Sequence, residues 1–382
     1  MNRAKAHSLP ETYDVAVIGA GVFGSWAAYR LALAGKSVVL LDAYGPAHSR
    51  ASSGGESRII RMGYGPQEIY TRWSMRSLEL WLEFCDIIND ASLFHRTGVL
   101  WTAPERDPYT QATRDVLTRC GTKFESLSAS DLTARFPQFR FGHVTEGILE
   151  PDSGALMARR AVQSLVREAV RRGVKYVHDG VESPTQSESL HTISGERIKA
   201  EAYVFACGAW LPKLFPDVLG QTIRPTRQEV FFFGLNPGDS RFHSPEMPVW
   251  IDFSDERRPY TLPALEGRGF KLAFDTPGSE FDPDRGSRLL SPDGIVAAHA
   301  FIGKHLPSLA GAPLIESRVC QYELTPNRDF IIDRHPAYGN VWLVGGGSGH
   351  GFKHGPALGE HVANLVQGLA TPEPQFRLSG SV

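Results

Sequence analysis

Short runs of apolar residues alternate along the chain with segments of helical periodicity. Asp14–Ile18 is followed directly by Gly19, and Ser37–Leu41 is followed by Asp42. Continuous apolar runs of this length are typical of strands that are buried on both faces of a parallel sheet. Between these two runs, Val22–Ala34 carries bulky apolar residues at helical spacing. The pattern therefore predicts a β-α-β unit near the start of the chain.

The same two patterns return much later in the sequence. Tyr203–Cys207 and Val341–Val344 are further apolar runs that lead into glycine. Leu156–Gly173 has an amphipathic helical pattern with arginines on its outer face, and Pro356–Gln367 is also helical in pattern. These segments predict that the parallel sheet is completed by distant parts of the chain.

Two other regions have a different character. Gly98–Ala103 and Gln228–Lys271 are rich in strand-forming and aromatic residues and are interrupted by Pro and Gly, which predicts an antiparallel sheet. The fold class we expect is α/β, a Rossmann-like nucleotide-binding domain interleaved with an antiparallel-sheet α+β substrate domain. We expect the first domain to be discontinuous (10–84, 150–216 and 322–382) and the second to comprise 85–149 and 217–321.

Composition excludes several classes of function. The chain has 382 residues, of which 42% are hydrophobic, so it can bury a large core. Its formal net charge is −2, so we expect no nucleic-acid partner and no binding to an anionic membrane. No uncharged apolar run approaches the roughly 18 residues of a membrane span.

Cysteine usage and the chain ends indicate the compartment. Cys85, Cys120, Cys207 and Cys320 lie far apart without a CxxC pair, which predicts neither a disulfide framework nor a metal site. Met1–Pro10 lacks the apolar core of a signal peptide, and the end of the chain matches no lipidation signal. We expect a cytoplasmic location.

A glycine-rich motif lies where the first strand meets the first helix. Gly19, Gly21 and Gly24 form GxGxxG, and Asp42 ends the second strand. The first glycine permits a tight turn, the second lets the backbone approach a pyrophosphate, and the third allows close packing of helix and strand. The carboxylate of Asp42 is placed to accept a ribose hydroxyl. The motif predicts a dinucleotide cofactor without distinguishing FAD from NAD.

Three further stretches carry a family resemblance. They are Gly55-Glu-Ser-Arg-Ile-Ile-Arg61 with Tyr64-Gly65, Cys320-Gln-Tyr-Glu-Leu-Thr-Pro326 with Asp329-Phe-Ile-Ile-Asp333, and Ser348-Gly-His-Gly-Phe-Lys353. Together with GxGxxG, the chain resembles the monomeric sarcosine oxidase and N-methyltryptophan oxidase group of FAD-dependent amine oxidases. The resemblance extends over nearly the whole chain.

The resemblance implies how the cofactor is held. It implies FAD, attached covalently by a thioether between Cys320 and the 8α carbon of the flavin, which requires a thiolate. The turn before Lys353 would face the pyrimidine ring of the flavin, where negative charge collects on reduction. Besides Cys320 and the GxGxxG residues, the cofactor-binding positions are Ser57, Gly349, His350, Gly351 and Phe352.

The resemblance also assigns roles around the substrate. It implies that Arg61 and Lys353 bind the substrate carboxylate, and that Arg58 lies close to the flavin ring. Lys271 matches the lysine that activates dioxygen, because a cation there would stabilise superoxide. Tyr260 and Tyr322 match tyrosines that line the substrate cavity. No dedicated catalytic acid or base is found in these motifs.

The implied reaction is oxidation of the C–N bond of a secondary (N-methyl or cyclic) amino acid to an imine that hydrolyses, with dioxygen reduced to hydrogen peroxide. Its partners would be a small amine and dioxygen, and the protein would be a monomer. Alternatives are an enzyme that resembles D-amino-acid oxidase or glycine oxidase, a fructosyl-amino-acid oxidase, or a quinone-linked dehydrogenase of the same fold. A nucleotide-binding redox sensor is disfavoured, because it would need no carboxylate clamp.

The chain departs from these relatives near the substrate. The sarcosine oxidases have a histidine where this chain has Asp275, a histidine near Gly54 and a bulky residue near Gly347. We expect the two glycines to enlarge the space beside the flavin and to favour an amine bulkier than sarcosine.

Overall fold

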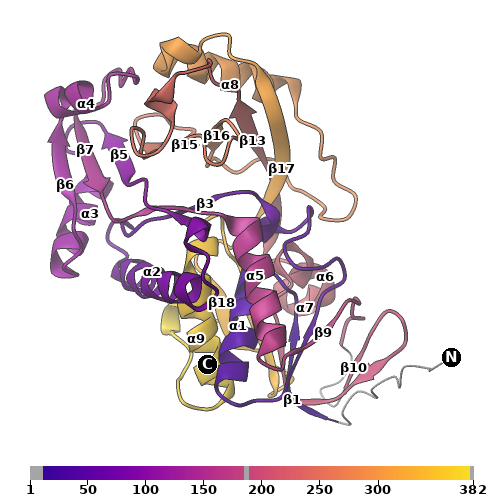
Figure 1. The fold of residues 1–382 in the computed structure, drawn as a ribbon. Coiled ribbons are helices and arrows are strands. Elements are labelled where there is room, and N and C mark those ends of the chain that lie inside the picture. The colour runs from indigo at the N-terminus through magenta and orange to yellow at the C-terminus, as the bar shows by residue number, and fades with distance from the viewer. Residues whose placement is uncertain (1–11, 185–188, 379–382) are drawn as a thin grey trace.

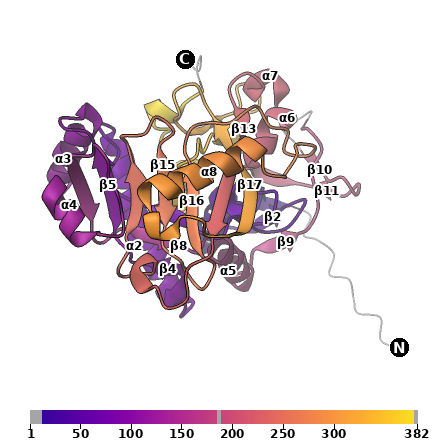
Figure 2. The same ribbon diagram turned by 90° about the horizontal axis from the view of Figure 1, so that it is seen from above.

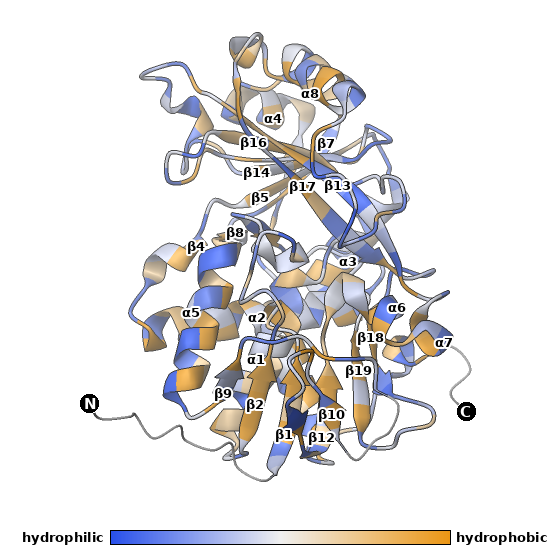
Figure 3. Cartoon of the chain, turned by 90° about the vertical axis from the view of Figure 1, so that its right-hand side faces the viewer, coloured by the Kyte–Doolittle hydropathy of each residue, from blue (hydrophilic) through white to orange (hydrophobic). Residues whose placement is uncertain are grey.

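A computed structural model describes residues 12–184 and 189–378. Its two large sheets lie one above the other, with helices packed mainly around the lower one (Figures 1 and 3). Met1–Pro10 and the last residues of the chain, on which the expectations about chain ends rest, lie outside the described residues.

The lower sheet contains the predicted parallel strands. Its six strands follow the order β18-β19-β12-β1-β2-β9. All neighbouring pairs are parallel except β18 and β19. The strands are β18 (Ile331–Arg334), β19 (Val341–Gly345), β12 (Ala200–Phe205), β1 (Tyr13–Ile18), β2 (Val38–Leu41) and β9 (Lys175–Val177). Every residue of β2 and β19 is buried, as continuous apolar runs predict.

Helix α1 (Val22–Leu33) is the centre of the helical layer. It packs against α5 (Ala158–Arg171) and α9 (Gly355–Val366), and α9 also packs against α2 (Glu68–Ile87). The side chain of Trp26 on α1 is only 1% exposed. Helix α5 begins later than the sequence pattern predicts, because Gly154–Leu156 pairs as strand β8.

The upper sheet is larger. Its eight strands follow the order β17-β13-β16-β15-β14-β5-β7-β6. The prediction of an antiparallel sheet is correct for all neighbouring pairs but one, because β14 runs parallel to β5. Those two strands come from distant parts of the chain, so no hairpin dictates their direction. The strands are β17 (Leu314–Leu324), β13 (Arg224–Phe233), β16 (Phe270–Phe274), β15 (Pro259–Leu262), β14 (Val249–Asp252), β5 (Val99–Ala103), β7 (Glu146–Glu150) and β6 (Glu125–Ser128).

The two faces of this sheet have different surroundings. Helix α8 (Pro292–His305) lies across one face, as the view from above shows (Figure 2). Phe270 and Leu272 of β16 belong to the apolar cluster beneath it. Because side chains alternate along a strand, Lys271 points to the opposite face, towards the lower sheet.

The remaining elements connect the two sheets or lie at the edges. Strands β3 (Arg58–Ile60), β8 and β4 (Phe94–His95) form a small sheet, and β10 (Leu190–His191) pairs with β11 (Arg197–Ile198). The other helices are α3 (Pro108–Arg119), α4 (Ala129–Arg135), α6 (Leu211–Leu214) and α7 (Pro216–Leu219). Within the described residues, no helix has the length and apolar character that a membrane span requires.

Glu150, at the end of β7, joins the upper sheet to the loop after β3. It is 1% exposed, and its carboxylate accepts the backbone N–H groups of Met62 (2.6 Å) and Gly63 (2.9 Å). It also accepts the indole N–H of Trp101 (2.8 Å) and the hydroxyl of Ser153 (2.6 Å). A buried carboxylate with this many donors fixes the backbone beside Arg61.

Removing this carboxylate should destabilise the protein. We expect Glu150→Ala to lower the free energy of unfolding by about 3 kcal/mol or more, because several buried donors lose their acceptor. Chemical denaturation measures the change. Glu125→Ala is the matched control, since Glu125 forms an exposed pair with Arg135, and it should cost about 1 kcal/mol or less. Similar losses in both variants would contradict this role of Glu150.

Candidate active site

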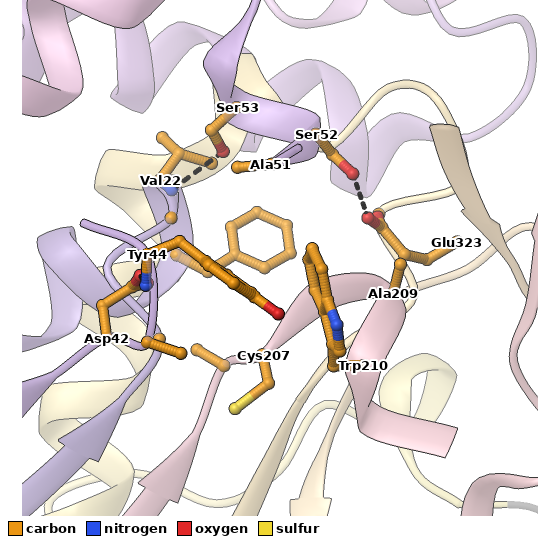
Figure 4. A pocket seen from close by; sticks show the side chains of 18 of the residues that line it. Val22, Asp42, Tyr44, Ala51, Ser52, Ser53, Cys207, Ala209, Trp210 and Glu323 are labelled. Atoms are coloured by element: carbon orange, nitrogen blue, oxygen red, sulfur yellow. Dashed lines mark hydrogen bonds between the residues drawn. The ribbon is translucent and has the colours of Figure 1, made fainter. Parts of the chain in front are cut away.

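A long cavity begins at the carboxyl ends of β1 and β2. Its lining includes Gly19, Gly21, Cys320 and Phe352. Figure 4 shows others of its lining residues, among them Asp42, Cys207 and Glu323. Ligands of open parallel sheets bind at this edge, so the cavity lies where a dinucleotide is expected.

The glycine-rich loop fits a dinucleotide. Gly19 has φ +103°, and a Cβ there would lie 2.4 Å from the carbonyl oxygen of Ala206. A Cβ on Gly24 would lie 1.9 Å from the carbonyl oxygen of Gly19, so only glycine lets α1 come this close to β1. A Cβ on Gly21 would have Ser53 Oγ as its nearest neighbour, at the ordinary contact distance of 3.5 Å, so the loop is open towards the cavity there. The N-terminus of α1 therefore faces space suited to a pyrophosphate.

Two hydrogen-bonding groups steady this loop. The carboxylate of Asp42 accepts the N–H groups of Ala20 (2.7 Å), Tyr44 (2.9 Å) and Gly45 (2.8 Å) while lining the cavity. Its predicted contact with a ribose hydroxyl remains a prediction. The N–H of Val22 donates to Ser53 Oγ at 3.0 Å, an acceptor that the sequence analysis missed.

Glu323 also lines the first cavity and was missed. It is 7% exposed, its carboxylate accepts the hydroxyl of Ser52, and burial raises the pKa of the carboxyl (Figure 4). A raised pKa favours the uncharged carboxylic acid. The only available signal was that Glu323 is the one acidic residue of the Cys320–Pro326 motif.

Two cysteines face the first cavity in different surroundings. Cys320 is 5% exposed, and Nη2 of Arg58 donates to its Sγ at 3.4 Å. The thiol of Cys320 also donates to the carbonyl oxygen of Ser52 at 3.8 Å, and that of Cys207 donates to the carbonyl oxygen of Ile18 at 3.4 Å, where burial raises its pKa. A cationic side chain therefore lies at the sulfur of Cys320, while the sulfur of Cys207 contacts a backbone carbonyl.

A second cavity lies between the two sheets and has a volume of about 400 Å³. It meets the first where Arg58, Tyr322, Gly349 and Phe352 line both. A volume of this size suits a small molecule. Among the described residues, its charged lining consists of Arg58, Arg61, Arg258, Lys271, Arg328, Lys353 and Asp275.

Arg61 and Lys353 meet at Tyr64. The Nζ of Lys353 donates to the hydroxyl of Tyr64 at 2.7 Å and to the carbonyl oxygen of His350 at 3.0 Å. The guanidinium of Arg61 lies over the rings of Tyr64 (4.3 Å) and Trp101 (4.4 Å). Burial, and secondly the charge of Arg61, lower the pKa of Lys353 well below its usual value. An anion bound here would relieve this repulsion.

Lys271 is buried on the cavity face of β16. Its Nζ donates to the carbonyl oxygen of Ser57 at 2.8 Å, and burial, followed by the charge of Arg58, lowers its pKa well below the usual value. Ser57 and His350 were both predicted to bind cofactor. Ser57 lines neither cavity, and His350 lines the second one only. Their contact with cofactor remains a prediction.

The two predicted tyrosines both line the second cavity. Burial raises the pKa of Tyr260 to about 12. The hydroxyl of Tyr322 donates to Oδ1 of Asp275 at 3.1 Å. The sequence motifs brought attention to Tyr322 without indicating its bond to Asp275.

Gly54 lines neither cavity, so the expectation that it enlarges the space beside the flavin is wrong, whereas the same expectation for Gly347 stays a prediction. A Cβ on Gly54 would lie 2.0 Å from the carbonyl oxygen of His48, so this glycine is packed against backbone. Gly347 lines the first cavity and not the second. Asp275 does line the second cavity, where it places a carboxylate among cationic side chains.

Comparisons with known proteins agree with this geometry. The chain is 32% identical to monomeric sarcosine oxidase of Bacillus sp. (strain B-0618) over 364 residues, which is 93% of this chain and 92% of that protein. It is 28% identical to N-methyl-L-tryptophan oxidase of Citrobacter koseri over 376 residues, 96% of this chain and 97% of that protein.

The solved structures include a close match in fold. L-proline dehydrogenase from P. horikoshii superposes with a TM-score of 0.84 at 20% sequence identity, covering 97% of each chain. The family model described as FAD dependent oxidoreductase matches residues 14–365. The chain therefore belongs to this family of FAD-dependent oxidoreductases.

Proposed function

We propose that the protein oxidises the C–N bond of a secondary amino acid, N-methylated or cyclic. The observation that carries the proposal is the meeting of Arg61 and Lys353 at Tyr64, in a cavity that opens onto the cofactor cavity. The names of the related sarcosine and N-methyltryptophan oxidases support an N-methyl amino acid.

The residues of this cavity suggest how the substrate is held. Arg61 and Lys353 would bind the carboxylate through charge-assisted hydrogen bonds, which fixes the neighbouring carbon and nitrogen. The positions shared by the two cavities, Arg58 and Tyr322 among them, lie where that C–N bond would meet the cofactor. FAD, when bound, would take two electrons from the substrate and pass them to dioxygen, giving hydrogen peroxide. The imine product then hydrolyses in water.

We also propose covalent attachment of FAD through Cys320. Support comes from the guanidinium of Arg58 beside its sulfur, which favours the nucleophilic thiolate. The glycine loop, Cys320 and Phe352 line the same cavity, so a dinucleotide bound at the loop could extend to the sulfur of Cys320.

Lys271 is proposed to assist the reduction of dioxygen. It lies on the substrate side of the upper sheet, close enough to Arg58 for that charge to lower its pKa. Negative charge that develops on dioxygen would favour the ammonium form of a lysine placed there.

The protein is further proposed to act as a monomer in the cytoplasm. The four cysteines within the described residues are free thiols, and the relatives include enzymes named monomeric sarcosine oxidase.

A panel of amines tests the reaction. Under nitrogen, N-methylated or cyclic amino acids should bleach the flavin absorbance, and in air they should yield peroxide. Matched amines without a carboxylate, such as piperidine against pipecolate, should lose about 30-fold or more in kcat/KM, because a charge-assisted contact is worth roughly 2–5 kcal/mol. Preference for primary amino acids or fructosyl amino acids, or bleaching that only a quinone reverses, would support the alternatives instead.

Acid precipitation tests the covalent link. The yellow colour should stay in the pellet of the wild type and move to the supernatant for Cys320→Ala. Cys207→Ala is the matched control, because Cys207 lines the same cavity without a guanidinium at its sulfur, and its pellet should remain yellow. Colour released from wild-type protein would refute the link.

Stopped-flow measurements of the two half-reactions test Lys271. Lys271→Met should slow reoxidation of the reduced flavin by about a thousandfold, the equivalent of roughly 4 kcal/mol of lost charge stabilisation. Anaerobic reduction by substrate should change by less than about tenfold. Lys271→Arg keeps the charge and should recover part of the rate. Equal slowing of both half-reactions would exclude the assignment.

A further inference from the structure

Asp275 is the one carboxylate among the described residues that line the second cavity. It directly follows β16, four residues after Lys271, so both side chains point to the same face of the sheet. The side chain of Asp275 is 34% exposed. All the other charged groups of that lining are cations. An acid in such surroundings is the natural partner of a positively charged part of the ligand.

The contacts of Asp275 leave it able to accept a proton. Tyr322 donates to Oδ1 at 3.1 Å, and the nearest nitrogen of Arg328 lies 3.7 Å from Oδ2. Its backbone N–H is shared between the carbonyl oxygens of Arg257 and Arg258, both at 3.1 Å, which fixes the residue at the cavity wall. Asp275 interacts electrostatically with several tyrosines and cations around the cavity. They are Arg61, Tyr64, Tyr109, Arg258, Tyr260, Tyr322, Arg328 and Lys353.

The proposed reaction creates a need for such an acceptor. An amino acid in neutral water carries an ammonium group, and the nitrogen lone pair must be free before the C–N bond can be oxidised. An ammonium group is also unfavourable in a cavity lined by several cations. The proton must therefore leave the nitrogen, and Asp275 is the carboxylate within this lining.

We propose that Asp275 receives this proton through the hydroxyl of Tyr322. The ammonium N–H proton passes to the oxygen of Tyr322, and the original hydroxyl proton passes to Oδ1 of Asp275. The amine becomes neutral, Tyr322 remains neutral, and the carboxylate becomes a carboxylic acid, so charge and protons balance. The substrate carboxylate stays on Arg61 and Lys353. This inference rests on the proposed function.

Two features suit Asp275 to this role. Burial raises the pKa of its carboxyl, which makes it a better base than an exposed aspartate. Arg328, at 3.7 Å, and secondarily the hydrogen bond from Tyr322 favour the ionised form that must be present before the substrate binds. Asp275 is thus a positioning residue that acts through Tyr322.

Equilibrium binding provides a test that needs no turnover. 2-Aminoisobutyrate has no hydrogen on its α-carbon and cannot form the imine there, and isobutyrate is its counterpart without the amine. At pH 7, Asp275→Asn should reduce the preference for 2-aminoisobutyrate over isobutyrate by at least about tenfold. Isobutyrate itself should bind equally well or more tightly, because a negative charge is removed. Asp255→Asn is the matched control, since Asp255 pairs with Arg257 and does not line the cavity.

The pH dependence of anaerobic reduction provides the second test. The substrate is the amine that reduces the wild-type flavin fastest in the panel described above. For the wild type, the second-order rate constant of flavin reduction should not change with pH between the pKa of Asp275 and the pKa of the free amine. In Asp275→Asn it should fall about tenfold for each pH unit below the amine pKa, because only the neutral amine then reacts. An unchanged ligand preference together with an unchanged profile would overturn the proposal, as would equal weakening of both ligands. If no amine reduces the wild type, the proposed function fails, while the ligand pair still tests Asp275.

Discussion

The burial of several like charges in one cavity is the constraint on which this structure depends. Three of these cationic side chains, Arg58, Lys271 and Lys353, donate hydrogen bonds to neutral oxygen atoms. Arg58 donates to the carbonyl oxygens of Ser52 and Ser57, Lys271 to that of Ser57, and Lys353 to the hydroxyl of Tyr64. Because no carboxylate in the part of the chain that the structure describes forms an ion pair with these three side chains, their field remains available to an incoming anion.

This arrangement requires both large sheets. Strand β17 carries Cys320 and Tyr322 on one face, two residues apart, so one side chain lies on the cofactor cavity and the other on both cavities. Glu150 of the same sheet holds the loop beside Arg61. The cationic side chains of the second cavity are therefore positioned by hydrogen bonds and strand register in both sheets. Substitutions outside the cavity should accordingly alter their positions.

Among the described residues, six cationic side chains and one carboxylate line the second cavity. The glycine at position 54 is required by the backbone of His48 and leaves no added room. Asp275 and Arg328, in contrast, lie on the cavity wall and interact with each other. Substrate selection should accordingly depend on the protonation state of the amine as well as on its size.

The sequence by itself determined the β-α-β unit, the glycine loop and the family motifs, because these features depend on local periodicity and on backbone conformations that few residues adopt. Gly19, with its positive φ, is an example. Tertiary structure alone decided that β14 runs parallel to β5, that Glu150 supports the loop of Arg61, and that Tyr322 donates to Asp275. Each of these contacts joins residues distant in the chain. Their partners are chosen by strand order and by the need to satisfy buried polar groups, which no local pattern encodes.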